Sequence, residues 1–523
     1  MIAKIRAALR SRGHTAFLAA SVLLGILVGI GASLLVWGIE LIIESITDAD
    51  ATLSWGKWMV VASVPLGLLA SWLLDRKLGP GVAGGGVAET MVAVNLEGGY
   101  LATKPIPTKL VATAVTLGSG GSGGREGPIV MIGAAIGSSF ARHSRFDLDR
   151  IKSFVAAGAG AGIGASFNTP IAGMMFALEV ILSSFAVRHI SAVVITSVAA
   201  AVTTHSLVGE EQFLRSPAFE LEHPTQLILY AILAVVVVLF AILFLRILDL
   251  SSRSKFPARL PPWLLPISAG LAVALIGVAY PETLGTGQDF LTDLLSLRDH
   301  GSYVWWSLII VSVLKAVTSA ITRRGGGSAG TFMPALVMGG AIGAGFAILI
   351  DPLWGFSEIE PGAFALVGMA AALAAMVRAP LTAVILVFEL TGDYGLVLPL
   401  MLAAALATFI GERLHPDSSY TMSLNRKGIR LPTTEDIDLL DTVEVGQVMS
   451  DIDSAANPEM NLDELQLLLD RTHHHGVAVV EDDRFVGLIT LSDIQAAGGP
   501  SPTRIVRDEM TIRPITVTPD MPV

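Results

Sequence analysis

Two glycine-rich loops are the parts of this 523-residue chain best suited to bind a small ion. The first, 118–128, reads GSGGSGGREGP, and the second, 325–334, reads GGGSAGTFMP. Each ends in a proline, Pro128 or Pro334, which suits a first helical turn because its missing N–H would be unpaired there. Glycine lets a ligand approach the backbone closely. The loops therefore predict two helix starts with accessible backbone N–H groups.

Two such helix starts aimed at one point would bind an anion. The N–H groups of a first turn have no partner within the helix, and the helix dipole adds partial positive charge there. Such a site attracts an anion without a full cation, which suits transport because the ion must also leave. The competing interpretation is close helix packing through small residues.

Glu126 is the acidic residue inside the first loop. A carboxylate at membrane depth is costly and points to function. When ionised, it could sit where the anion sits and close the path, and when protonated, it would swing away. One residue would then couple proton binding to anion passage. The simpler alternative is that Glu126 forms an ion pair with Arg125.

The first loop also fits two enzyme motifs formally. Gly118-x-Gly120-x-x-Gly123 matches a dinucleotide-binding loop, but it lacks the strand–helix–strand context and the later acidic residue. Gly120-x-Ser122-x-Gly124 matches the nucleophile elbow of hydrolases, but no histidine has a matching context. We therefore expect no enzyme activity. Labelling by a fluorophosphonate probe would contradict this expectation.

The composition is typical of a membrane protein with an acidic, more soluble tail. Hydrophobic residues make up 52% of the chain, charged residues 15%, and the mean hydropathy is +0.66, whereas soluble domains carry about 25% charged residues. Residues 431–523 hold 18 acidic and 5 basic residues, and the first 430 hold 27 and 29. The net charge of −11 is therefore no objection to an anion site in the body. Cysteine is absent, which excludes disulfides and thiolate metal sites.

The elements that must position the loops are apolar segments. A basic N-terminus, 1–16, precedes an apolar run at 16–38 that can cross a hydrocarbon core of about 30 Å. Further runs lie near 57–74, 190–208, 226–248, 263–280, 303–321 and 396–412. Basic residues before the first run and after the last predict that both termini are cytoplasmic, with an even number of crossings.

Two regions between these runs, 108–187 and 325–392, are divided by glycine and proline into short apolar pieces. They align with each other when Pro128 is matched to Pro334, an offset of 206. Further on, at an offset of 210, the matched pairs are Gly158 and Gly368, Pro170 and Pro380, and Glu179 and Glu389. Such interrupted segments in two halves indicate a transporter binding site. The alignment leaves open whether the halves are parallel or inverted.

With these motifs, the chain resembles the CLC family of chloride channels and transporters. GREGP at 124–128 matches a family motif in full, and GTFMP at 330–334 fits its G-x-F-x-P motif. GPGVA at 79–83 matches the third motif, G-S-G-I-P, in part, and FNTPIAGMMFALE at 167–179 resembles the segment after the first motif. The resemblance covers about 17–428.

The resemblance implies an all-α polytopic membrane protein with short, tilted and broken helices. Its two inverted repeats would span about 17–250 and 262–428. It also implies a homodimer with one pore in each subunit. We expect an integral protein of the plasma membrane that handles chloride or nitrate and protons, needs no cofactor or metal, and binds no nucleic acid.

The resemblance further implies roles for single residues. Glu126 would be the gating glutamate, and the Tyr420 hydroxyl would donate a hydrogen bond to the anion. The remaining residues expected around the anion, mostly through their backbone, are Pro80, Gly81, Gly124, Arg125, Gly127, Thr331 and Phe332.

Two departures from the family pattern bear on mechanism. Pro80 stands where the family usually has serine, which removes a donor, and members with proline there favour nitrate. We therefore expect poor discrimination against nitrate or a preference for it. Val180, next to Glu179, stands where proton-coupled members carry a relay glutamate. This favours passive, channel-like chloride conduction, with proton-coupled exchange through Glu126 as the alternative.

The acidic tail resembles a CBS module. After a linker at 429–445, the module at 446–500 would hold a helix, two strands and a second helix, and 501–523 would begin an incomplete second module. The resemblance implies binding of ATP or AMP through Thr490 and Asp493, which would make the chain a nucleotide-responsive sensor. The alternative is that Asp493 only caps its helix. The adjacent histidines 473–475 point in different directions and predict no metal site.

Overall fold

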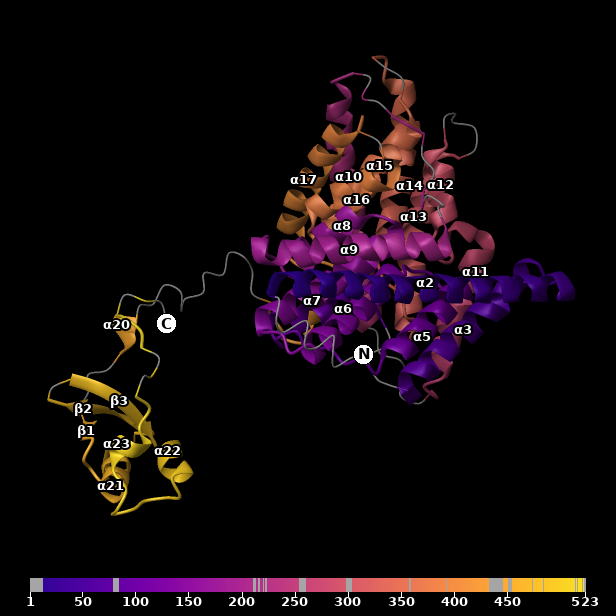
Figure 1. Cartoon of the computed structure of the whole chain (residues 1–523). Helices are drawn as coiled ribbons and strands as arrows, with labels where there is room; N and C mark the ends of the chain where they lie inside the picture. The colour runs from indigo at the N-terminus through magenta and orange to yellow at the C-terminus, as the bar shows by residue number, and fades with distance from the viewer. Residues whose placement is uncertain are drawn as a thin grey trace. The chain divides into compact units, whose positions relative to one another are not determined.

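The computed structural model divides into two compact units, 1–432 and 433–523. The first is helical and the second is a small α+β fold (Figure 1). The structure describes residues 13–78, 84–209, 213–214, 217–219, 221, 223–253, 260–297, 303–356, 359–392, 394–431, 445–449, 454–472, 474–482, 484–512, 514, 516–519 and 521.

The helices of the first unit follow one another with short connections. In chain order they are α2 (Gly13–Leu53), α3 (Lys57–Leu78), α4 (Val87–Asn95), α5 (Ile106–Gly118), α6 (Glu126–His143), α7 (Leu148–Phe167), α8 (Pro170–Phe176), the π-helical turn η1 (Ala177–Ile181), α9 (Val187–Val208), α10 (Gln226–Arg253), α11 (Leu264–Ala279), η2 (Pro281–Thr283), α12 (Gln288–Leu295), α13 (Trp305–Arg324), α14 (Phe332–Ile350), η3 (Asp351–Leu353), α15 (Pro361–Val377), α16 (Pro380–Thr391), α17 (Val397–Leu414) and α18 (Thr421–Arg426).

Within the described residues, seven helical segments are long and apolar enough to cross a membrane: α2, α3, α9, α10, α13, α14 with η3, and α17. The first of them, α2, lies beside α9 (Figure 1). Shorter apolar helices lie between these segments, as the glycine and proline interruptions predict. The expected all-α polytopic fold is confirmed.

Two helices form the centre of this unit. Every residue of α15 is buried, and α7 is buried continuously from Ser153 to Phe167. Both are apolar on all faces, and such helices are stable only when other helices surround them. Each occupies the same place in its half of the alignment.

Matched glycines permit the closest helix crossings in both halves. A Cβ added to Gly133 would lie 2.1 Å from the carbonyl oxygen of Gly158, where α6 crosses α7. A Cβ added to Gly339 would lie 2.2 Å from the carbonyl oxygen of Gly368, where α14 crosses α15. No larger residue fits at such distances, so the small-residue packing interpretation holds for these glycines.

Two matched glutamates join the halves reciprocally. The Glu179 carboxylate accepts from the backbone N–H groups of Leu381 (3.1 Å) and Thr382 (2.7 Å) in the first turn of α16. The Glu389 carboxylate accepts from those of Ile171 (3.0 Å) and Ala172 (2.8 Å) in the first turn of α8. Because each glutamate caps a helix of the other half, a twofold rotation relates the halves.

The glycine loops meet on this twofold axis. Gly124 donates from its N–H to the carbonyl of Gly330 (3.0 Å), and Gly330 donates back to the carbonyl of Gly124 (2.7 Å). These two residues are equivalent at the offset of 206. The two loops predicted to act together are therefore in direct contact.

The second unit is built on a three-stranded sheet of order β1-β2-β3. Strand β1 (Ala455–Ala456) is parallel to β2 (Gly476–Glu481), which is antiparallel to β3 (Arg484–Thr490). The helices of this unit are α20 (Val445–Val448), α21 (Leu462–Thr472), α22 (Leu491–Ala496) and α23 (Val506–Glu509). Its core includes Leu465, Val479 and Ile489.

Residues 505–511 pack onto this sheet. Leu488 and Thr511 exchange backbone hydrogen bonds, and Val506 is fully buried in the core. Arg507 forms ion pairs with Glu459 and Glu481. These carboxylates raise the pKa of the Arg507 guanidinium.

Candidate anion-binding site

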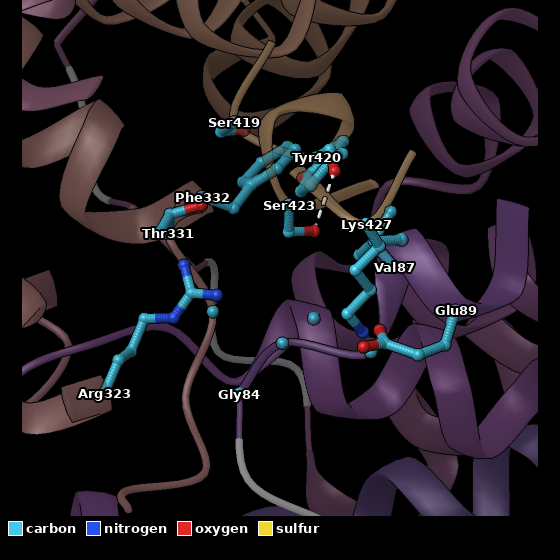
Figure 2. A pocket seen from close by; sticks show the side chains of 15 residues that line it. Gly84, Val87, Glu89, Arg323, Thr331, Phe332, Ser419, Tyr420, Ser423 and Lys427 are labelled. Carbon is cyan, nitrogen blue, oxygen red and sulfur yellow. Dashed lines mark hydrogen bonds between the residues drawn. The ribbon is translucent and has the colours of Figure 1, made fainter. Parts of the chain in front are cut away.

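A cavity of about 130 Å³ lies where three helices of the first unit begin. Figure 2 shows the side chains around it. The helices are α4, α14 and α18, and the described residues that line the cavity are Gly84, Gly85, Gly86, Val87, Ala88, Glu89, Gly127, Arg323, Gly330, Thr331, Phe332, Ser419, Tyr420, Ser423 and Lys427.

Two helix starts face this cavity with no side-chain cap. Helix α4 follows Gly86, whose φ of 90° is a conformation that favours glycine. Helix α14 follows Thr331, which likewise makes no capping hydrogen bond from its side chain. Uncapped first-turn N–H groups carry partial positive charge and are available to a ligand. The cavity therefore has the chemistry of an anion site.

Hydroxyl groups of the third element complete the donor set. Tyr420, at the start of α18, is 8% exposed and lines the cavity (Figure 2). The buried Ser419 hydroxyl has no hydrogen-bond partner among the residues that the structure describes. Ser423 is turned back and donates to the Tyr420 carbonyl (3.2 Å). Tyr420 and Ser419 are thus the hydroxyls available to an anion.

Glu126 is 1% exposed and lies beside the cavity. It is the first residue of α6, and Gly127, the next residue, lines the cavity. Neither of its carboxylate oxygens has a hydrogen-bond partner among the described residues, although the backbone N–H groups of Met333 and Arg125 are near enough to act on the carboxylate. Met333 belongs to the first turn of α14. The carboxylate therefore lies at the same helix start that would hold an anion.

Gly124 makes room for this carboxylate. A Cβ at Gly124 would lie 2.0 Å from Glu126 Oε2 and 3.2 Å from the Met333 nitrogen. Arg125 is directed elsewhere: its guanidinium donates to the Ser166 carbonyl (2.8 Å) and lies over the Phe213 ring. Arg125 therefore uses its side chain to hold α7 and not to form an ion pair with Glu126.

The third loop was predicted at 79–83, and that prediction remains untested. Pro80 and Gly81 lie outside the described residues. The loop that reaches the cavity is 84–88, and its sequence GGGVA repeats the G-x-G-V-A pattern of 79–83. A sequence pattern that occurs twice in tandem cannot by itself identify which copy starts the helix. Only the second copy runs directly into α4.

Val180 lies in the apolar core of the first unit. It is 5% exposed in the π-helical turn η1. Its neighbour Glu179 is engaged in capping α16. Position 180 therefore carries a buried apolar side chain where proton-coupled members carry a glutamate.

In the second unit, Thr490 and Asp493 bond to each other. The Asp493 carboxylate accepts from the Thr490 N–H (2.8 Å) and hydroxyl (2.7 Å), which forms a capping box for α22. The capping interpretation describes this geometry.

Sequence reasoning missed Arg323, Glu89, Ser419 and Lys427 in the first unit. A basic residue between an apolar helix and a glycine loop was the available signal for Arg323.

Comparisons with known proteins agree with this architecture. A family profile described as Voltage gated chloride channel matches residues 66–412, and one described as CBS domain matches 445–498. The chloride channel protein CLC-f of Arabidopsis thaliana is 30% identical over 439 residues, 74% of this chain and 56% of that protein. The H(+)/Cl(-) exchange transporter ClcA of Vibrio cholerae is 31% identical over 436 residues, 78% of this chain and 88% of that protein.

Solved structures share the fold. A slow cyanobacterial Cl-/H+ antiporter superposes with a TM-score of 0.70 at 23% identity, covering 79% of this chain and 97% of that chain. A CLC-type fluoride/proton antiporter superposes with a TM-score of 0.65 at 21% identity, covering 78% and 97%. At these identities the likeness concerns the fold.

Proposed function

The chain belongs to the voltage-gated chloride channel (CLC) family, and from that premise we propose that it exchanges chloride for protons across a membrane. The observation that carries this proposal is the position of Glu126. Its carboxylate is buried at the start of α14, beside the cavity formed by Tyr420 and the glycine loops. A carboxylate and a chloride ion compete for the same N–H groups there.

The exchange follows from this competition. While Glu126 is ionised, its negative charge occupies the start of α14 and repels an incoming anion. Protonation removes that charge, so the side chain loses its attraction to the helix start and an anion can take its place. Return of the carboxylate displaces the anion and releases the proton. One residue thus alternates between the two substrates. The exchangers among the relatives support this choice.

Passive, channel-like conduction is the second candidate. Val180 favours it, because a buried valine gives protons no carrier at that position. In that case protonation of Glu126 would open the path without moving protons across the membrane.

Substitution of Glu126 tests the proposal. We expect Glu126→Gln, which resembles the protonated side chain, to pass chloride at a rate independent of pH and to move no protons. Flux from liposomes holding the purified chain measures both. Tyr420→Phe is the control, because it leaves Glu126 in place and should retain pH dependence. Proton movement that survives Glu126→Gln would refute the gating role.

We also propose that Gly85 replaces Pro80 as the residue at the central anion position. Gly85 lines the cavity one residue before the left-handed Gly86. Its backbone N–H and the first turn of α4 would face the anion without a hydroxyl. This arrangement supports the poor discrimination against nitrate, or the preference for it, that was expected from Pro80.

A further inference from the structure

Arg323 places a full positive charge at the cavity. It belongs to the last turn of α13 and is half-buried. Figure 2 shows its guanidinium directed into the cavity. A Cβ at Gly84 would lie 3.8 Å from Arg323 Nη2, which is van der Waals contact. The guanidinium therefore borders the same space as the start of α4.

This guanidinium is available to a ligand. Among the residues that the structure describes, no carboxylate or hydrogen-bond acceptor pairs with it, although Glu89, Tyr420 and Arg426 act on it through their charge or polarity. The arginines Arg125 and Arg378 of the same unit instead donate to backbone carbonyls. An arginine that faces a cavity without a protein acceptor can pair with an anionic ligand there.

The internal repeat separates structural cations from this one. Lys109 and Lys315 are equivalent at the offset of 206 and are both almost fully buried. Lys109 donates to the Gly84 carbonyl (2.7 Å) and Lys315 to the Gly285 carbonyl (2.9 Å), so each holds the turn before a short helix. A role that recurs in both halves belongs to the fold.

Arg323 has no such counterpart. The residue 206 positions earlier is Leu117, which is 3% exposed and packs in the core of the first half. The fold therefore builds the equivalent turn without a charge there. The cavity is also one-sided, because α18 contributes Ser419 and Tyr420 to it. The charge of Arg323, which has no equivalent in the first half, therefore lies at a cavity whose lining is also not repeated between the halves.

We propose that Arg323 is a specificity-determining residue that makes this cavity bind planar monovalent oxyanions, such as nitrate, in preference to chloride. A guanidinium is a planar fork of N–H donors that pairs two oxygens at once. A spherical chloride ion can use the charge but not the fork. Ser419, whose hydroxyl is unpaired among the described residues, and Tyr420 line the same cavity. This inference rests on the proposed anion transport and names its substrate class.

The test compares nitrate and chloride binding to the purified full chain by titration calorimetry. Arg323→Lys keeps the charge and removes the fork. We expect it to weaken nitrate binding about tenfold, equivalent to about 1.4 kcal/mol, with chloride binding nearly unchanged. Arg323→Gln should weaken both. Arg413→Gln is the matched control, because Arg413 also lies in the last turn of a membrane helix but is exposed and does not line the cavity.

The outcomes separate the two proposals. Equal losses of nitrate and chloride affinity in Arg323→Lys, or no loss in either substituted protein, would overturn the oxyanion assignment. Chloride flux of the wild-type chain in liposomes is measured alongside. If that flux is absent, the proposed function fails. If flux is present and Arg323→Lys leaves the nitrate-to-chloride affinity ratio unchanged, only the assignment of Arg323 as an oxyanion-binding residue fails. Coincident size-exclusion profiles of all variants verify that each is folded.

Discussion

At the scale of single residues, the cavity combines groups that attract an anion with one that imitates it. Tyr420 and the starts of α4 and α14 attract negative charge, and Glu126 competes for the same place. Thr331, Phe332, Gly127 and Tyr420 were named from motif positions, and the structure gathers them around one cavity. Two tandem GxGVA patterns match the third loop, and residue types alone cannot say which of them begins a helix.

Gly85→Ser tests the selectivity of that loop. The backbone of Gly85 is not in the left-handed region, and a Cβ there meets its nearest atom at 3.9 Å, so serine fits without strain. We expect the new hydroxyl to donate to a bound anion, which is worth about 1 kcal/mol. The chloride-to-nitrate flux ratio should rise about fivefold.

Pro80→Ser is the paired variant, because it places serine at the same point of the other GxGVA copy. It should leave the flux ratio unchanged. A shift with Pro80→Ser and none with Gly85→Ser would return the selectivity position to Pro80.

At the scale of elements, the repeat alignment predicts which residues of the two halves are equivalent, but not how the halves contact each other. The proline-to-glutamate spacing of nine was visible in both halves, but only the structure shows that each glutamate caps the other half's helix. The reason lies in tertiary contact, because the two partners are about 200 residues apart. Short helices need such caps, since their unpaired N–H groups would otherwise be buried.

Glu179→Gln should therefore lower stability. The amide cannot accept with both atoms, so one N–H of the α16 first turn loses its partner. We expect a loss of about 1–2 kcal/mol in the free energy of unfolding, measured by thermal unfolding in detergent. Glu389→Gln should also lower stability, because Glu389 accepts from two backbone N–H groups of α8. A normal unfolding temperature for both variants would contradict the reciprocal-cap account.

At the scale of the whole molecule, charge is separated between two units. The tail accounts for the acidity of the chain, and the helical unit is close to neutral. Anion attraction therefore depends on helix starts and on Arg323, and not on net charge. The boundary between the units was visible as a change in composition. The contacts of 505–511 were not, because a short polar segment has no strong pattern.

The tail should fold alone, since it has its own core. We expect 433–523 to unfold in one cooperative transition. Asp493→Ala should lower its free energy of unfolding by about 1 kcal/mol through loss of the capping box. Thermal unfolding with and without ATP or AMP measures this loss and the nucleotide binding that the CBS resemblance implies. An unchanged midpoint for Asp493→Ala would show that the cap contributes little.

Simultaneous recording of chloride efflux and internal pH in liposomes with the wild-type chain tests the central claim most directly. The vesicles begin with high internal chloride and equal pH on both sides, and the membrane potential is set to oppose passive proton entry. Exchange through Glu126 predicts that chloride efflux drives protons inward against this potential, and that Glu126→Gln abolishes the proton signal while chloride still leaves. Chloride efflux with no proton movement in the wild-type chain would contradict exchange and establish passive conduction.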